Sequence, residues 1–382
     1  MAKVVKKLGS EFINSPRHQL IYMVRTITLL AAIGSFSGCG QSGSGAGAPG
    51  NSNEPSASQN DIGTLWLGGT FISVNGKDCR NLAQIKSETV TCYPIEPLSS
   101  ITNIRKILYK DAKIYVIGKF SHIAGVQTNG IGKFAGDSWS SVGSNIADLG
   151  GNVFDLLVKA DNEVYASTYN NSQKIWKFNG SAWQDLNFPS TDFVRSLTVN
   201  AAGHLFAATS SNSGTGAGSF GVYKWDGSAW SNVGAANGSI NVIRANSAGD
   251  LYIAGDFTTL GSTTTGKVAK FTGSQWSGIG NVTQGTVYQL ELSDSTLWIS
   301  GTSLAGGSIN YFENGLWTGL PSVLNGTTQT IMLDTKNNFV ACGSSTLAGT
   351  TSISGIAKYT SGNWSPLATL GQANCQSVLL VP

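Results

Sequence analysis

The sequence has little charge. Only 12% of its 382 residues are Asp, Glu, Lys or Arg, and the formal net charge is +3. The positive excess lies in the first 38 residues, which contain five Lys or Arg and one Glu and so contribute +4. The remaining chain therefore has a formal charge of −1 and offers no basic surface for nucleic-acid phosphates. We expect no nucleic-acid partner.

Recognisable catalytic and metal-binding motifs are also missing. The sequence contains no G-x-S-x-G, H-E-x-x-H, C-x-x-C or D-x-D-x-D-G, and it has only three His. His122 and His204 fall in loops that open on opposite faces of the fold expected below, so these two cannot share a metal or a substrate. We predict no metal, no cofactor and a function in binding rather than catalysis.

Long apolar runs are absent except for a short one near the N-terminus. It covers Ile27–Phe36, follows the basic segment Met23–Arg25 and ends in Phe36-Ser37-Gly38-Cys39. The run is too short to span a bilayer. With its basic flank and its small residues it is typical of a signal peptide, and Met23 is then the expected translation start.

The Phe-Ser-Gly-Cys segment resembles the lipobox of bacterial lipoproteins. In that family the Cys is lipidated and becomes N-terminal after cleavage, so the resemblance implies removal of residues 1–38 and lipidation of Cys39. A lipid anchor places the protein in the cell envelope, and we expect the outer membrane. A plain signal peptide and a short buried helix are the alternatives. Residues 39–60 are small and polar with one charge, Glu54, which is typical of a flexible tether.

The rest of the chain, residues 61–382, is rich in Gly and repeats one pattern of short strands. Each copy contains a segment that begins with a large apolar residue and continues into small residues. The seven segments are LWLGGTF from Leu65, IYVIGKF from Ile114, VYASTYN from Val164, LFAATSS from Leu205, LYIAGDF from Leu251, LWISGTS from Leu297 and FVACGSS from Phe339. Their spacing of 41 to 50 residues indicates four-stranded propeller blades. We predict an all-β, seven-bladed β-propeller.

The two ends of the repeat region complement each other. The first strand of a copy reads V-x-x-L-x-V, as in Val153 to Val158, and the first copy lacks it. The segment Cys375–Leu380 fits the missing strand. We therefore predict that the C-terminal strand pairs in blade one, beside Leu65–Phe71, and closes the ring, which removes open sheet edges.

Pairs of aromatic residues, five positions apart, mark an outer hairpin in six copies. The pairs are Phe134/Trp139, Phe178/Trp183, Trp225/Trp230, Phe271/Trp276, Phe312/Trp317 and Tyr359/Trp364. A tight turn between the partners would place both rings on one face of the sheet. We expect these rings to pack between blades, and a ligand-binding ladder is the alternative.

The combined repeat, Y-[I/V]-x-G-x-F followed by A-x-[F/W]-x-G-x-x-W, resembles kelch-like, galactose-oxidase-type propellers of exported bacterial proteins. The resemblance covers Asp61 to Pro382 and implies the propeller fold. It does not imply catalysis, because the copper ligands of Tyr and His and the sialidase box S-x-D-x-G-x-T-W are both absent.

Cysteines are few. Besides Cys39 the chain has Cys79, Cys92, Cys342 and Cys375, which allow three pairings in an exported protein. Cys79 and Cys375 are predicted at one face of the same blade, so we favour a Cys79–Cys375 disulfide and expect Cys342 to stay free.

These features predict a monomeric envelope lipoprotein whose propeller binds a protein or glycan partner. The long loops between second and third strands are candidate binding regions: 73–80, 121–130, 210–221, 258–266 and 345–354. A second candidate set lies at the channel end of the first strands, where the alternative is an ordinary hydrated polar lining. It comprises Arg105, Arg195, Asn241, Tyr288, Gln329 and Gln376. The rival prediction is a sugar- or lactone-active hydrolase or lyase at the channel mouth that uses Asp155, Asp256 and Glu291.

Overall fold

The computed structural model describes residues 63–99, 102–143, 149–160, 162–211, 220–293, 296–320, 324–333, 338–372 and 374–381. The predicted signal peptide, the tether and Cys39 lie outside these ranges. Within them the regular structure consists of short β-strands. None of the described residues belongs to a helix that is long and apolar enough to cross a membrane.

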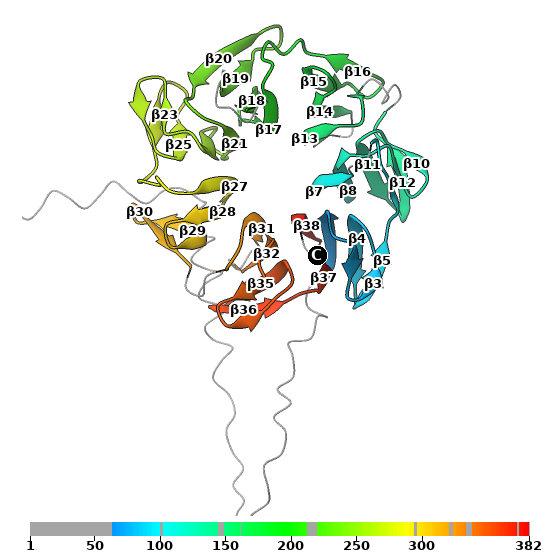
Figure 1. Ribbon diagram of the computed structural model, residues 1–382. Helices are drawn as coiled ribbons and strands as arrows, with labels where there is room; N and C mark the ends of the chain where they lie inside the picture. Colours follow the sequence, from blue (N-terminus) through cyan, green and yellow to red (C-terminus); the bar gives the residue numbers. More distant parts are fainter. Residues whose placement is uncertain are drawn as a thin grey trace, which may run out of the picture. The chain divides into compact units, whose positions relative to one another are not determined.

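The described strands form seven four-stranded antiparallel sheets arranged around a common centre (Figure 1). From the inner strand outward, three of them are β38 (Cys375–Val381), β1 (Thr64–Gly69), β4 (Leu82–Lys86), β5 (Thr89–Cys92); β7 (Asn103–Lys110), β8 (Lys113–Lys119), β11 (Ile131–Ala135), β12 (Ser138–Ser141); and β13 (Val153–Ala160), β14 (Glu163–Tyr169), β15 (Gln173–Phe178), β16 (Trp183–Asp185).

The other four sheets follow in chain order. They are β17 (Phe193–Val199), β18 (Leu205–Ser210), β19 (Gly221–Trp225), β20 (Trp230–Ala235); β21 (Ile240–Ala245), β22 (Leu251–Gly255), β25 (Val268–Phe271), β26 (Trp276–Gly278); β27 (Thr286–Leu292), β28 (Leu297–Leu304), β29 (Gly307–Glu313), β30 (Leu316–Gly319); and β31 (Thr328–Leu333), β32 (Phe339–Gly343), β35 (Ile356–Thr360), β36 (Asn363–Pro366). The predicted all-β fold of repeated four-stranded sheets is confirmed.

Small hairpins occupy four of the five loops predicted between second and third strands. They are β2 (Ser73–Val74) with β3 (Lys77–Asp78), β9 (His122–Ile123) with β10 (Val126–Gln127), β23 (Thr259–Leu260) with β24 (Thr263–Thr264), and β33 (Leu347–Ala348) with β34 (Thr351–Ser352). The first hairpin also pairs with β37 (Leu370–Gly371), and the second pairs with β6 (Ile95–Glu96). Most of the fifth loop, 210–221, lies outside the described residues.

Near its start, each inner strand contains one irregularity in its pairing with the second strand, and β13 has a further one near its end. In β27, Val287 pairs with Gly301 and Gln289 pairs with Ser300, so Tyr288 has no partner in the ladder. Such a β-bulge adds one residue to one strand. We call the unpaired residues near the strand starts the bulge residues. They are Arg105, Phe154, Arg195, Asn241, Tyr288, Gln329 and Gln376.

The bulge explains the V-x-x-L-x-V spacing. Side chains of a regular strand alternate between two faces, so residues three apart would face opposite ways. Because the bulge residue takes one position out of the ladder, Val287, Leu290 and Leu292 fall on the same face and join one apolar cluster. The inner strands therefore read as a regular alternating pattern interrupted by one inserted residue.

In five of the seven sheets a Gly of the second strand pairs with the residue before the bulge, where two backbones come close together. Thr168 and Thr209 take this place in the other two sheets. A Cβ at Gly301 would stand 1.9 Å from the carbonyl oxygen of Thr286, and a Cβ at Gly118 would stand 1.9 Å from that of Asn103. Real side chains do not tolerate this approach, so the repeat needs Gly at these two positions.

The six predicted cross-strand aromatic pairs are confirmed, with ring centroids 4.9 to 5.3 Å apart. In four of the pairs the Trp also hydrogen bonds to the preceding sheet. The indole N–H of Trp276 donates to the Val233 carbonyl at 2.8 Å, and that of Trp317 donates to the Ile279 carbonyl at 2.7 Å. Trp183 and Trp230 make the same kind of bond to the Val142 and Leu186 carbonyls. In these four pairs the ring thus packs between sheets and its indole N–H is satisfied there.

The two ends of the described chain lie side by side in one sheet (Figure 1). The N-terminal strand β1 pairs with the C-terminal strand β38 from Thr64 opposite Val381 to Gly69 opposite Cys375. On its other side, β38 packs against the inner strands of both neighbouring sheets, β31 and β7.

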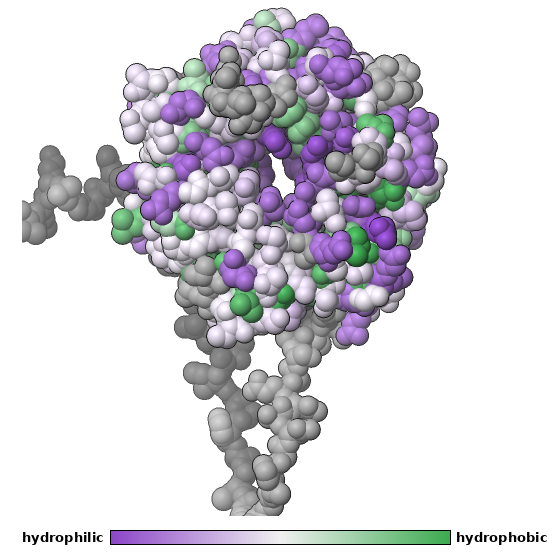
Figure 2. All heavy atoms as spheres, viewed as in Figure 1, coloured by the Kyte–Doolittle hydropathy of each residue, from purple (hydrophilic) through white to green (hydrophobic). Residues whose placement is uncertain are grey.

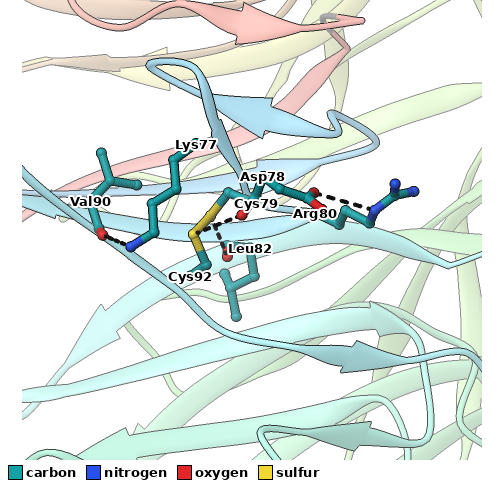
Figure 3. The surroundings of a disulfide bond; sticks show 7 residues. All are labelled: Lys77, Asp78, Cys79, Arg80, Leu82, Val90 and Cys92. Carbon is teal, nitrogen blue, oxygen red and sulfur yellow. Dashed lines mark hydrogen bonds and ion pairs between the residues drawn. A yellow bond between two sulfur atoms is a disulfide. The ribbon is translucent and has the colours of Figure 1, made fainter.

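The predicted disulfide pairing was wrong. The structure pairs Cys79 with Cys92 and Cys342 with Cys375, with Cα–Cα distances of 5.2 and 5.4 Å. The β2–β3 hairpin lies along β5, where the Lys77 ammonium donates to the Val90 carbonyl at 2.8 Å, and this brings Cys79 to Cys92 (Figure 3). Cys375 begins β38 and faces Cys342 across the junction of two sheets, inside one apolar cluster. Two disulfides in one chain are typical of extracytoplasmic proteins.

The Cys342–Cys375 disulfide predicts a selective effect on β38. Replacing both residues by Ser should lower the free energy of unfolding by about 3 to 4 kcal/mol, because the unfolded chain regains the freedom of the loop that the bond closes. Hydrogen exchange of the β38 amides should also become faster, since this disulfide ties β38 to the neighbouring sheet. The matched control, C79S/C92S, should lose about 3 kcal/mol without selective exchange in β38. Equal exchange of β38 in the two variants would contradict the prediction.

Candidate functional site

A cavity of about 760 Å³ opens at the centre of the seven sheets and is lined by residues of all seven inner strands. Figure 2 shows the central opening with hydrophilic residues around it. Ligand sites of proteins commonly enclose 300 to 1,000 Å³, so this cavity is large enough for a small molecule or a short oligosaccharide.

All seven bulge residues line this cavity. They include the six residues named from the sequence, which the structure brings together around one space. The bulge directs each side chain toward the cavity while its neighbours remain in the sheet. The seventh bulge residue, Phe154, was not predicted because it is apolar, whereas the predicted set consists of residues with a polar group. Its place directly after the first Val of V-x-x-L was the available signal.

Asp155, one of the three acids of the rival prediction, is a buried carboxylate at the cavity wall with 2% exposure. Its Oδ1 accepts a hydrogen bond from the Lys106 ammonium, and its Oδ2 accepts one from the backbone N–H of Leu197 at 2.7 Å. Lys106, Asp155 and Leu197 belong to the three consecutive inner strands β7, β13 and β17. Asp155 thus joins three sheets, and its charge is neutralised by Lys106.

The other two acids of that prediction are also paired. Glu291 lines the cavity, lies 3.5 Å from the Arg244 guanidinium and accepts a hydrogen bond from Gln289. Asp256 is not part of the cavity lining and lies 3.7 Å from the Lys267 ammonium. Each carboxylate thus has a cation beside it, and the structure does not bring all three together. Among the described residues, no group of three or more His, Cys, Asp or Glu is arranged to hold a metal ion.

Arg105 and Arg195 both lie against the ring of Phe154. The guanidinium carbon of Arg105 lies 4.1 Å from the centre of the Phe154 ring, and that of Arg195 lies 5.3 Å from it. Arg195 also lies 5.7 Å from the Phe193 ring, which stacks on Phe154 at 4.8 Å. Cations attract the faces of aromatic rings at these distances. In the part of the chain that the structure describes, neither guanidinium forms an ion pair with a carboxylate.

The pKa of each of these guanidinium groups is lowered. Burial, and after it the positive charge of Arg195, lowers the pKa of Arg105 to about 10. Burial also lowers the pKa of Arg195. Both residues remain protonated at neutral pH, so the wall of the cavity holds two positive charges close together.

Two bulge residues are fixed by hydrogen bonds to the next inner strand. One terminal nitrogen of Arg105 donates to the Asn152 side-chain oxygen at 2.8 Å and to the Val153 carbonyl at 3.0 Å. The Asn241 amide donates to the Val287 carbonyl at 2.8 Å. Tyr288 is partly buried, and this burial, followed by the charge of Asp256, raises the pKa of its hydroxyl. The ring of bulge residues is therefore partly preorganised.

The chain is similar to known proteins in its structure. No protein-family profile and no curated protein sequence match the chain. A putative 6-phosphogluconolactonase from Bacteroides fragilis is 12% identical and aligns over 86% of this chain and 100% of its own, with a TM-score of 0.51. A GH74 enzyme from Niastella koreensis is 17% identical, aligns over 73% of this chain and 47% of its own, and has a TM-score of 0.50.

The extracellular domain of a putative hybrid two-component system from B. thetaiotaomicron is 12% identical over 75% of this chain, with a TM-score of 0.49. The chain spans 36% of the length of that domain. The structures that match are β-propellers, and the likeness shows that this chain has the β-propeller fold. Binding domains and enzymes both use this fold, so the fold does not decide between the two classes of function.

Proposed function

We propose that the chain is an exported binding protein built as a closed, seven-bladed β-propeller. Seven four-stranded sheets, the pairing of β1 with β38 and the Cys342–Cys375 bond between neighbouring sheets support this architecture. The contact of β38 with both β31 and β7 also supports it. In such a ring the last strand completes the first blade and leaves no open edge between the ends.

We further propose that the central cavity is the binding site and that it holds a glycan. One observation carries the proposal: the bulge residue of every inner strand lines the same cavity. The amides of Asn241, Gln329 and Gln376 and the hydroxyl of Tyr288 are donors and acceptors of the kind that sugar hydroxyls require. A cavity of about 760 Å³ holds a few sugar units and is too small for a folded partner.

The ligand is bound without being transformed. The two carboxylates at the cavity wall, Asp155 and Glu291, are engaged by Lys106 and Arg244. A general acid or base needs a carboxyl group that can exchange a proton with the substrate. A cation beside each carboxylate opposes this role.

The test of cavity binding is a glycan array of neutral and acidic oligosaccharides probed with the purified chain, followed by calorimetry on the best ligand. Gln329→Ala should weaken binding by about 2- to 10-fold, which is the effect of one lost hydrogen bond. The control, Gln184→Ala, changes an exposed residue of the outer strand β16 and should leave affinity unchanged. Two results would contradict the proposal: no oligosaccharide binds, or the bound oligosaccharide is cleaved.

The N-terminal sequence adds a proposed location. We propose that the lipobox-like segment before Cys39 and the tether at 39–60 attach the propeller to a bacterial envelope membrane. Labelling with a tritiated fatty acid should mark the natural chain and should fail to mark Cys39→Ser. The variant should also move from the membrane fraction to the soluble envelope fraction. Equal label in both chains would overturn the anchor and leave the binding site unaffected.

A further inference from the structure

The charges at the cavity wall are unevenly distributed. Four cations and two carboxylates line the cavity. Lys106 is paired with Asp155, and Arg244 is paired with Glu291. The remaining two cations are Arg105 and Arg195, which flank Phe154 in the order of the inner strands. The net positive charge of the cavity therefore lies on one part of its wall, formed by β7, β13 and β17.

This pair of arginines is held in place although the two charges repel each other. Arg105 is fixed by the Asn152 side chain, the Val153 carbonyl and the face of Phe154. Its hydrogen bonds to these groups use one terminal nitrogen, and a guanidinium has five N–H donors. Arg195 is held by two aromatic faces and exposes its side chain at the cavity. Donors therefore remain for a group that is not part of the described chain.

An anionic ligand suits this arrangement. Arg105 is half-buried and Arg195 is exposed to the cavity, so a ligand that fills the cavity would withdraw both charges from water. This is destabilising unless the ligand supplies a partner, and an oxyanion supplies one. Guanidinium groups bind carboxylate and phosphoryl oxygens through short, charge-assisted hydrogen bonds. A neutral ligand would leave both positive charges uncompensated.

We propose that Arg105 and Arg195 form an oxyanion subsite that binds the carboxylate or phosphoryl group of an acidic sugar. The inference rests on the proposed glycan binding and specifies its chemical class. The ligand would place its anionic group at Arg105, Phe154 and Arg195. Its hydroxyl groups would face the four following bulge residues, which are Asn241, Tyr288, Gln329 and Gln376.

Calorimetry at low salt on the full chain tests the subsite with matched ligand pairs. The carboxylate pair is trigalacturonate and its methyl ester, and the phosphoryl pair is glucose 6-phosphate and glucose. The acid of at least one pair should bind ten or more times more tightly than its neutral partner, and the pair that responds identifies the source of the oxyanion. Equal affinity of acid and neutral partner in both pairs would overturn the subsite.

Variants distinguish binding at the subsite from a general effect of the positive charge of the protein. Arg195→Gln should reduce the affinity for the acid by at least tenfold and leave the neutral partner unchanged, and Arg195→Lys should restore part of the loss. The control, Lys224→Gln, removes one positive charge from the third strand β19, away from the cavity, and should have no effect. A loss for the acid that Lys224→Gln reproduces would also overturn the subsite.

The two proposals can fail separately. If the neutral partner binds as tightly as the acid and Gln329→Ala weakens both, the oxyanion subsite is wrong and glycan binding in the cavity stands. If none of the four ligands binds and the array is also negative, both proposals are wrong. Circular dichroism and the melting temperature of each variant verify that it is folded before its affinity is interpreted.

Discussion

The start of each inner strand is the place on which the architecture depends. In five of the seven sheets a Gly of the second strand pairs there with the inner strand, and at Gly118 and Gly301 the backbones are too close for a Cβ. The inner strand carries one residue more than its partner at this point. This inserted residue keeps the flanking apolar residues on the buried face, and its own side chain lines the cavity. One local irregularity thus serves the core and the candidate site together.

The same geometry separates two kinds of polar residue at the cavity. Residues that directly follow the bulge, such as Asp155 and Ser196, hydrogen bond to neighbouring sheets. They hold the wall together. The bulge residues stand nearer the free space, and two of them, Arg105 and Arg195, keep a positive charge that no described carboxylate balances. The wall is therefore neutral where sheets join and positive where a ligand can reach it.

Periodicity predicted those parts of the structure that repeat. The V-x-x-L spacing located the inner strands, and the position after the first Val gave six of the seven bulge residues without knowledge of the bulge itself. Contacts between different sheets were not predictable in this way. Lys106 and Asp155, which pair between two strands, are 49 residues apart in the sequence. Cys79 meets Cys92 only because a small hairpin lies along β5. These contacts depend on how sheets and hairpins are packed, which no repeat pattern records.

Single-residue deletions in β27 test most directly whether the bulge residue is an insertion in a regular strand. Deletion of Tyr288 leaves Val287, Leu290 and Leu292 in strict alternation, so we expect a folded chain whose melting temperature falls by only a few degrees, equivalent to about 1 kcal/mol. Deletion of Glu291 shifts Leu292 to the opposite face and should lower the melting temperature several times more. If both deletions are equally damaging, the bulge is not a separable insertion and the account is wrong.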